Sequence, residues 1–325
     1  MRIARILIGV AIAVVVSVGA HAPVLKIQRP TALTAAATIT HPPINEQSGI
    51  VKSRTYDDVY WVHNDSGDEA RIFAIRSDGS VIMPSWVGDR YYADQPAEGK
   101  EPYPGIRLDA AHNLDWEDIA IEGDTLYIGD VGNNGNARRD LGVYVLKEPN
   151  PRATMRTRVL KWLPVAYADQ KEYPGDRWHF DCEALFVHKG KLHFLTKHRA
   201  GATGDLPENG TKLYRLDTEF TDRVNVLTLL DSKQDLGGWV TAADISPDEK
   251  HLAVLTQFPV ASVWLFELPA QGDKLLSGNA RRFVFSGGKQ CEGVCFVDDR
   301  TLLVTNEQRE IFRLSLDGFS PAVAK

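Results

Sequence analysis

The segment Glu117-Asp118-Ile119-Ala120-Ile121-Glu122-Gly123-Asp124-Thr125-Leu126-Tyr127-Ile128-Gly129-Asp130, followed by Val143-Tyr144, contains three features that recur along the chain. An acidic or small residue begins an apolar strand, a second apolar strand ends on a small hydrogen-bonding residue, and a third strand carries an aromatic residue. Short alternating runs separated by Gly, Asp, Asn and Pro are typical of β-strands, and no long segment has a helical period. We therefore predict an all-β fold built from a repeat.

The three features occur five times in the same order. The strand beginnings are Ser48-Gly49-Ile50, Glu117-Asp118-Ile119, Glu183-Ala184-Leu185, Ala243-Asp244-Ile245 and Glu292-Gly293-Val294. The second strands are Tyr60 to Asn64, Leu126 to Asp130, Leu192 to Thr196, Leu252 to Thr256 and Leu302 to Asn306. The aromatic residues, expected to pack between repeats, are Phe73, Tyr144, Tyr214, Trp264 and Phe312. The first residue of each repeat lies 13 to 16 residues before the end of its second strand.

The repeat predicts a β-propeller, because four strands per unit form the blade of that fold. A further β-rich run follows the third strand, as in Arg156 to Val165, Arg223 to Leu230 and Arg281 to Phe285. The fifth unit ends near Leu316 without a fourth strand, and Ala32 to Thr40 would supply it and close the ring, leaving fewer open edges. We predict five four-stranded blades. A sixth could lie between Pro84 and Pro104, a stretch that we interpret instead as a loop inserted in the first unit.

The N-terminus has the pattern of a secretory signal. Arg2 and Arg5 precede an apolar run from Ile6 to Val18, and small residues follow, with cleavage expected after Ala20. An uncleaved anchor is the alternative, but the run is shorter than the ~20 residues of a spanning helix. We predict a signal peptide at residues 1–20 and a single mature domain at residues 21–325, secreted or periplasmic and free of the membrane.

Composition limits the kinds of partner that we expect the protein to bind. The 325 residues carry a net charge of −6, from 37 basic and 43 acidic side chains, which gives no reason to expect nucleic-acid binding. Three cysteines exclude a disulfide-dense scaffold, and the odd number leaves at least one free thiol. A bridge between Cys182 and Cys291 would have to cross the channel mouth, so we expect none. Nothing in the sequence demands a partner chain, which favours a monomer.

The topology of a propeller brings distant residues together. The first strand of each blade lines the central channel, and the second strand returns to the end where the first began. This gathers Glu117, Glu183 and Glu292 at one mouth, with Ser48 and Ala243 as the non-acidic members. Two residues earlier, on the same side of each strand, lie Glu46, Asp115 and Asp181. The ends of the second strands add Asn64, Asp65, Asp130, Thr196, Lys197, Asn306 and Glu307.

A ring of carboxylates requires neutralisation, because like charges raise one another's pKa values. Ca²⁺ suits such a site, since it takes six to eight oxygen ligands. The candidate metal ligands are Glu117, Glu183, Glu292, Asp130, Asp115 and Asp181. Cationic side chains in neighbouring loops could do part of this work: Lys197, His198, His179, Arg138 and Arg139.

A purely structural reading of the acids remains open. Acids at strand starts can accept hydrogen bonds from the backbone of the next blade or cap turns. We favour that role for Asp118 and Asp244, whose side chains point the other way. The loop Asp130-Val131-Gly132-Asn133-Asn134-Gly135-Asn136 presents many oxygens, as a calcium loop or an exposed tight turn would, but it lacks the EF-hand spacing.

Other catalytic motifs are missing from the sequence. It contains no G-x-S-x-G elbow, no H-E-x-x-H zinc helix and no Walker A loop. Four histidines cluster in the third unit, at His179, His188, His193 and His198, but their spacing fits no standard zinc site. We expect them at the surface.

Two stretches carry a resemblance to a known group of proteins. Asn113-Leu114-Asp115-Trp116-Glu117-Asp118-Ile119-Ala120, followed by Leu126 to Asn134, resembles a signature of secreted bacterial β-propeller proteins, and so does His63-Asn64-Asp65-Ser66-Gly67. More distantly the chain is similar to phytase-like and gluconolactonase-like propellers, in which Ca²⁺ and carboxylates at the channel mouth carry hydrolysis. The resemblance implies that Glu117, Glu183, Glu292 and Asp130 correspond to metal-binding acids.

Two functions are compatible with these features. The first is a Ca²⁺-dependent extracytoplasmic hydrolase of an anionic ester, with Glu117 or Glu183 as base and Lys197, His198 or Arg138 stabilising the developing charge. The second is a non-catalytic module that binds a glycan, a peptide or a cell-envelope partner with the same face and the tyrosine-rich insertion (Tyr91, Tyr92, Tyr103).

Overall fold

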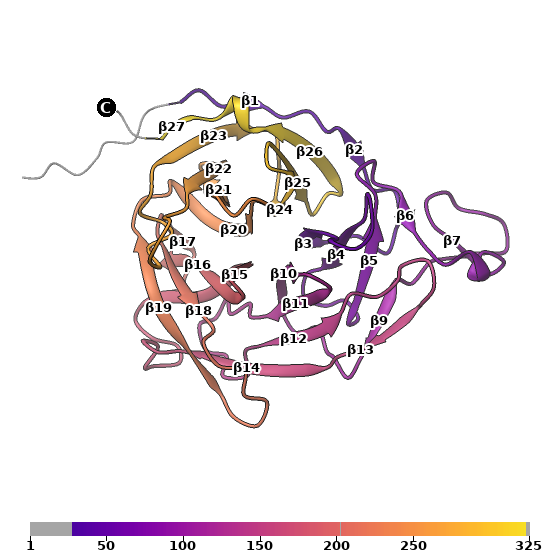
Figure 1. Cartoon of the computed structure of the whole chain (residues 1–325), viewed down its shortest axis with the longest axis horizontal. Helices are drawn as coiled ribbons and strands as arrows, with labels where there is room; N and C mark the ends of the chain where they lie inside the picture. Colours follow the sequence, from indigo (N-terminus) through magenta and orange to yellow (C-terminus); the bar gives the residue numbers. More distant parts are fainter. Residues whose placement is uncertain (1–27, 202, 323–325) are drawn as a thin grey trace, which may run out of the picture.

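The computed structural model describes residues 28–201 and 203–322. Over these residues the chain consists mainly of strands that surround a common centre (Figure 1), and the all-β prediction is confirmed. The signal peptide predicted at residues 1–20 lies outside the described residues. In the described ranges the helices are η1 (Ser85–Val87) and η2 (Leu316–Gly318), and no helix there has the length and apolar character needed to cross a membrane.

The strands form five antiparallel meanders that follow the sequence repeats. The first is β3 (Gln47–Lys52), β4 (Tyr60–Asn64), β5 (Arg71–Ile75) and β9 (Ile106–Asp109). The second is β10 (Trp116–Glu122), β11 (Thr125–Asp130), β12 (Gly142–Lys147) and β14 (Lys161–Tyr167). The third is β15 (Trp178–His188), β16 (Lys191–Ala200), β18 (Thr211–Arg215) and β19 (Asn225–Lys233).

The fourth and fifth meanders follow in sequence order. The fourth is β20 (Gly238–Ile245), β21 (His251–Pro259), β22 (Ser262–Glu267) and β23 (Ala280–Ser286). The fifth is β24 (Cys291–Asp298), β25 (Thr301–Asn306) and β26 (Glu310–Ser315), and β2 (Ala37–Thr38) pairs with β26 as its fourth strand. The segment that completes the fifth meander therefore comes from the opposite end of the sequence.

Further pairings cover outer strands of the meanders or add a short strand to an inner one. β1 (Thr31–Ala32) and β27 (Ser320–Pro321) pair with β23, and β13 (Arg156–Arg158) pairs with β9. β14 pairs with β19 of the following meander, β6 (Val81–Ile82) with β5, and β17 (Leu206–Glu208) with β16. These pairings occupy backbone groups that would otherwise form open edges.

Five apolar cores fill the spaces between neighbouring meanders. Each of the five repeat aromatics, Phe73, Tyr144, Tyr214, Trp264 and Phe312, is buried in a different core, as expected from the sequence. The innermost strands contact one another in the cyclic order β3, β10, β15, β20, β24 and back to β3. The five innermost strands therefore surround one central axis (Figure 1), along which the predicted channel would run.

The register predicted for the fourth repeat needs correction. The strand end Thr256 pairs with Val240, as Asp130 pairs with Trp116, so the counterpart of Glu117 is Thr241 rather than Ala243. The Thr241 hydroxyl donates to the carbonyl of Cys291 in the next meander at 2.9 Å, much as Ser48 donates to the carbonyl of Glu117 at 2.5 Å. Hydroxyl residues thus occupy the two non-acidic positions of the ring.

The insertion in the first meander lies away from the channel. It contains η1, β7 (Tyr91–Tyr92) and β8 (Glu101–Pro102) and extends outward from the wheel (Figure 1). Tyr103 is fully buried and its carbonyl bonds His41 Nε2 at 2.7 Å. Tyr103 therefore belongs to the core, and the insertion does not share a ligand-binding surface with the channel mouth.

Candidate functional site

Seven carboxylates converge at one mouth of the channel. They form three overlapping groups, and within each group one oxygen from every residue lies within 4.8 Å of the others. The groups are Glu117, Asp181 and Glu183; Asp65, Asp115 and Glu117; and Asp65, Glu292 and Glu307. The cluster, which we call the acidic mouth, thus contains five of the six predicted metal ligands. It also contains Asp65 and Glu307, noted in the sequence only as strand ends.

Burial dominates the electrostatics of the acidic mouth. Burial, followed by the charges of Glu183 and Asp65, raises the pKa of Glu117 well above its ordinary value. Burial and the neighbouring Glu183 raise the pKa of Asp181 to about 8 and that of Glu292 to about 9. Burial also raises the pKa of Asp115 to about 6. In the absence of a cation, Asp181 and Glu292 therefore keep their protons at neutral pH.

Two basic residues offset part of this charge. Lys197 Nζ lies 2.8 Å from Glu183 Oε1, and both side chains are largely buried. Burial lowers the pKa of Lys197, but Glu183, Asp181 and Glu117 outweigh this effect and raise it overall, so the ammonium stays charged. Arg199 Nη2 lies 3.6 Å from Asp181 Oδ2. Lys197 and Arg199 also lie over the indole of Trp239, 5.4 and 5.1 Å from the ring centre.

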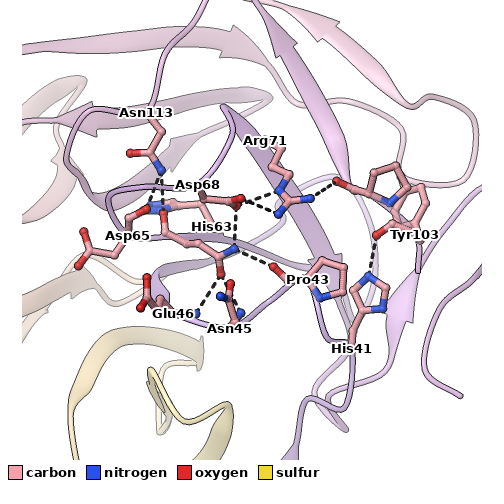
Figure 2. Close-up of polar contacts among 12 residues, drawn as sticks. His41, Pro43, Asn45, Glu46, His63, Asp65, Asp68, Arg71, Tyr103 and Asn113 are labelled. Atoms are coloured by element: carbon pink, nitrogen blue, oxygen red, sulfur yellow. Dashed lines mark hydrogen bonds and ion pairs between the residues drawn. The ribbon is translucent and has the colours of Figure 1, made fainter. Parts of the chain in front are cut away.

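An asparagine at the strand end positions the carboxylate that follows it. Asn64 Nδ2 donates to Asp68 Oδ2 at 2.7 Å, while its Oδ1 accepts from Asn45 and Glu46 N–H groups. Figure 2 shows this network, with the Asp65 carboxylate pointing away from the Asp68–Arg71 ion pair. Asn113 Nδ2 holds the Asp65 carbonyl at 2.8 Å.

The fifth meander repeats this arrangement. Asn306 Nδ2 donates to Glu310 Oε2 at 2.8 Å, and the Glu310 N–H donates back to Asn306 Oδ1 at 2.8 Å. The next residue, Glu307, then joins Asp65 and Glu292 in the acidic mouth. The first and fifth meanders thus use the same local device to present a carboxylate.

Asp130 lies beside the acidic mouth but is not a member of its three groups. Its Oδ1 accepts from Arg138 Nη2 at 2.9 Å and from the Asp115 N–H at 3.2 Å. The oxygens of the following loop are also used within the protein. Asn133 Oδ1 accepts from the Arg138 N–H and Asn136 Oδ1 from the Phe180 N–H, at 2.9 and 2.8 Å. The polar side chains of this loop therefore have a structural role.

The structure separates His198 from the other predicted catalytic residues. His198 follows Lys197 in β16, and successive side chains of a strand point to opposite faces. Lys197 faces Glu183 in the channel, while His198 stacks on His179 with ring centres 3.8 Å apart. The prediction that the third-unit histidines lie at the surface is wrong, because His179, His188, His193 and His198 are all buried.

Asp118 and Asp244 have the structural role expected of them. Asp118 Oδ2 accepts from the Leu185 N–H of the next meander at 2.8 Å. Asp244 Oδ2 accepts from the Phe296 N–H of the next meander at 2.7 Å. Both residues tie one innermost strand to its neighbour. The three cysteines, Cys182, Cys291 and Cys295, are free and buried.

No protein-family model matches the chain, and no curated protein matches it. Among solved structures, it is similar to a gluconolactonase from Xanthomonas campestris at 16% identity over 94% of this chain and 89% of that one, with a TM-score of 0.39. It is also similar to a glucose dehydrogenase at 11% identity over 88% and 99% of the two chains, with a TM-score of 0.43. The WD40 domain of Neurospora crassa Pan2 matches at 10% identity over 91% and 97%, with a TM-score of 0.40.

Proposed function

We propose that the protein is a Ca²⁺-dependent hydrolase of an anionic ester and that the acidic mouth is its active site. The observation that carries this proposal is the environment of the buried Asp181 carboxylate. Its side chain is fully buried in the group with Glu117 and Glu183, and its Oδ2 accepts no hydrogen bond among the described residues, where its charged neighbour is Arg199 Nη2 at 3.6 Å. A buried carboxylate oxygen left without a partner is costly, and a bound cation would satisfy it.

The donor set fits a hard divalent cation. Calcium prefers six to eight oxygens, and the acidic mouth offers carboxylates alone. Glu117 and Asp65 each belong to two of the three groups. Within the described part of the chain, Asp65, Asp115 and Glu117 take part in no ion pair, so these three would hold the ion, and Asp181, which shares a group with Glu117, would add its Oδ2. The bound ion would displace the protons that Asp181 and Glu292 carry at neutral pH.

The residues around the ion suit hydrolysis of an anionic substrate. Calcium, when bound, would polarise an ester or phosphoryl oxygen and make the mouth attractive to anions. Lys197 stays charged and lies at the mouth, where its ammonium would stabilise negative charge developing on the substrate. Glu183, 2.8 Å from that ammonium, would accept a proton from the attacking water. Arg138 is held by Asp130 and the Gly132 carbonyl, and His198 faces away, so neither contributes.

A binding module remains the second candidate, and one feature favours it. Trp239 lies beside Lys197 and Arg199. The ring centre of Phe258 lies 5.9 Å from that of Trp239, and 59% of the Phe258 surface is exposed. Exposed aromatic rings next to charged groups are the surface that sugars and peptides recognise. In this reading Ca²⁺ stabilises the module and the ligand rests on Trp239.

Several wider features accompany the proposal. We infer that the five meanders are the blades of one closed propeller, supported by the β2–β26 pairing and the cyclic contacts of the innermost strands. The N-terminal pattern supports export to the periplasm or the medium, where calcium is abundant enough for a weak site. The net charge of −6 argues against a nucleic-acid partner, and we propose a monomer.

Calorimetric titration with CaCl₂ tests the metal, using the wild type, Glu117→Gln and Glu183→Gln. Glu122→Gln is the matched control, because Glu122 lies at the exposed far end of the same strand as Glu117. We expect binding that Glu117→Gln weakens at least about tenfold and Glu122→Gln leaves unchanged. Binding should strengthen with pH between 6 and 9, by about tenfold per unit for each proton displaced.

The same proteins then separate the two functions. Calcium-dependent cleavage of phosphate or carboxylic esters that Lys197→Met abolishes supports the hydrolase. Calcium binding without cleavage of any ester in the panel, together with glycan or peptide binding lost in Trp239→Ala, supports the module. An absence of heat, with an unchanged melting temperature in calcium, rejects both calcium-based proposals.

A further inference from the structure

A second group of metal-ligating side chains lies away from the acidic mouth, in the third meander. His179 of β15, His198 of β16 and Glu208 of β17 each place one ligand atom within 4.8 Å of the others. Both histidines are buried and Glu208 is half-buried. None of the three belongs to the acidic mouth, so the group is independent of the calcium proposal.

The strand pairing explains how the three side chains meet. His198 and Glu208 lie directly opposite each other in the β16–β17 ladder. The register of β15 against β16 shifts between Trp178 and Asp181, which places His179 on the face of His198 while Asp181 enters the channel. The alternation of β16 separates His198 from Lys197 in the same way. The local backbone thus divides neighbouring residues between two sites.

The contacts of the two imidazoles leave ligand atoms available. His179 Nε2 lies 2.8 Å from Glu208 Oε2. His198 Nε2 lies 3.1 Å from Thr196 Oγ1, and its Nδ1 is buried with no hydrogen-bond partner among the described residues. The buried Nδ1 without a partner is a nitrogen that a bound metal would satisfy.

We propose that His179, His198 and Glu208 form a binding site for a zinc-type divalent transition metal. Two imidazoles and a carboxylate are a ligand set of Zn²⁺, whereas Ca²⁺ prefers oxygen alone. The ion would replace the proton that joins His179 to Glu208, and the parallel rings, now 3° apart in plane, would turn so that their nitrogens converge. The hydrogen bond between Thr196 and His198 would orient the His198 ring, as hydrogen bonds to metal ligands commonly do.

The fourth coordination position would face a cavity. A cavity of about 290 Å³ adjoins both histidines and is lined also by Asp169, Arg177 and Lys212. Lys212 Nζ lies 2.6 Å from Asp169 Oδ2, so its charge is already paired. Water or a small anion can therefore reach the ion. Three protein ligands with one open position match catalytic rather than closed structural zinc sites.

Titration of the full mature chain with ZnCl₂ tests the site. Saturating CaCl₂ fills the acidic mouth beforehand, and CoCl₂ serves as a spectroscopic probe of the ligand geometry. We expect one ion per chain, a higher melting temperature, and visible Co²⁺ bands of a four-coordinate site. Glu208→Gln and His198→Gln should weaken binding by at least about tenfold. Glu208 is half-buried at the end of a short strand, so its variant is expected to fold even if His198→Gln does not.

Two controls separate this site from other metal binding. His112→Gln removes an exposed histidine elsewhere and should leave the affinity unchanged. Glu117→Gln alters the acidic mouth and should also leave zinc binding unchanged. Zinc binding that survives Glu208→Gln, or is lost in Glu117→Gln, overturns the proposal, as does a titration with neither heat nor a shift in melting temperature. The calcium proposal stands or falls separately, since its test uses other residues.

Discussion

Gly132 packs so closely against Glu117 that a methyl group on its α-carbon would collide with Glu117 Oε1 and with the carboxyl group of Asp115. The backbone of Gly132 has no positive φ, so the need for glycine is one of space. The loop after β11 therefore forms a wall of the acidic mouth. Any side chain at this position would displace two of the carboxylates that we assign to calcium.

Gly132→Ala is expected to weaken calcium binding by about tenfold and to cost about 1–3 kcal/mol of stability, because the mouth is overpacked. Gly135→Ala is the matched control, since a methyl group there meets no atom within 4 Å. Calorimetry and thermal unfolding of both variants give the answer. Wild-type calcium affinity in Gly132→Ala would mean that Glu117 and Asp115 do not hold the ion.

Asp244→Asn should destabilise the protein without changing its calcium affinity. Asp244 accepts N–H groups of Ile245 and Phe296 at 2.8 and 2.7 Å, one on each oxygen, and asparagine keeps one accepting oxygen but replaces the other with an amide nitrogen that cannot accept. One lost bond with a buried unsatisfied group costs about 1–3 kcal/mol. Chemical denaturation measures the loss. A variant as stable as the wild type would show that this link between innermost strands contributes nothing.

Stability should fall in acid because buried histidines resist protonation. Burial lowers the pKa of His63 to about 4 from its ordinary 6.5, and its ring is fully buried against Trp116. Below pH 6.5 the unfolded chain takes up a proton that the folded chain refuses, so the stability present above pH 6.5 is lost as pH falls towards 4. For His63 alone this amounts to about 3 kcal/mol.

His63→Phe isolates that contribution. The phenyl ring keeps the packing on Trp116 and removes the titration, so the stability of the variant relative to the wild type should rise by about 3 kcal/mol between pH 7 and pH 4. Urea unfolding at both pH values measures the change. His112→Gln should show no such difference, because that side chain is exposed. A constant difference across this range would contradict the role of His63.

The sequence repeat predicted the strands and the convergence of the acids because both depend on period and order alone. Glu117, Glu183 and Glu292 could be assigned to one mouth, since each follows the residue that pairs with the predicted end of the second strand of its repeat. The Ala243 register was wrong because the turn between β20 and β21, closed by the pair Ile245–Leu252, is longer than the turn between β10 and β11, closed by the pair Glu122–Thr125, so the spacing of the second repeat does not apply to the fourth.

The second metal group was missed for a similar reason. His179 faces His198 through a register shift, and Glu208 comes from a three-residue strand that no periodicity reveals. Asp130 illustrates the opposite error. Its sequence position matches the ring, yet a side-chain contact with Arg138, eight residues later, decides its role. Strand order can be predicted from sequence here, whereas the pairing of individual charges needs coordinates.

Lys197→Met should separate the two contributions of Lys197. Without calcium the variant leaves Glu183 buried and unpaired, and losing one partner of a buried pair costs about 3–5 kcal/mol. With calcium the loss should shrink, because the ion replaces the missing positive charge. Calcium affinity should rise by about tenfold or more, since a repelling charge has been removed from the mouth.

Lys147→Met, which breaks an exposed pair with Asp124, should change neither the stability nor the calcium affinity measurably. Thermal unfolding with and without calcium, followed by calorimetry, distinguishes these outcomes. Lower calcium affinity in Lys197→Met would mean that the ammonium does not repel the ion, and the ion would then not lie in the acidic mouth beside Lys197.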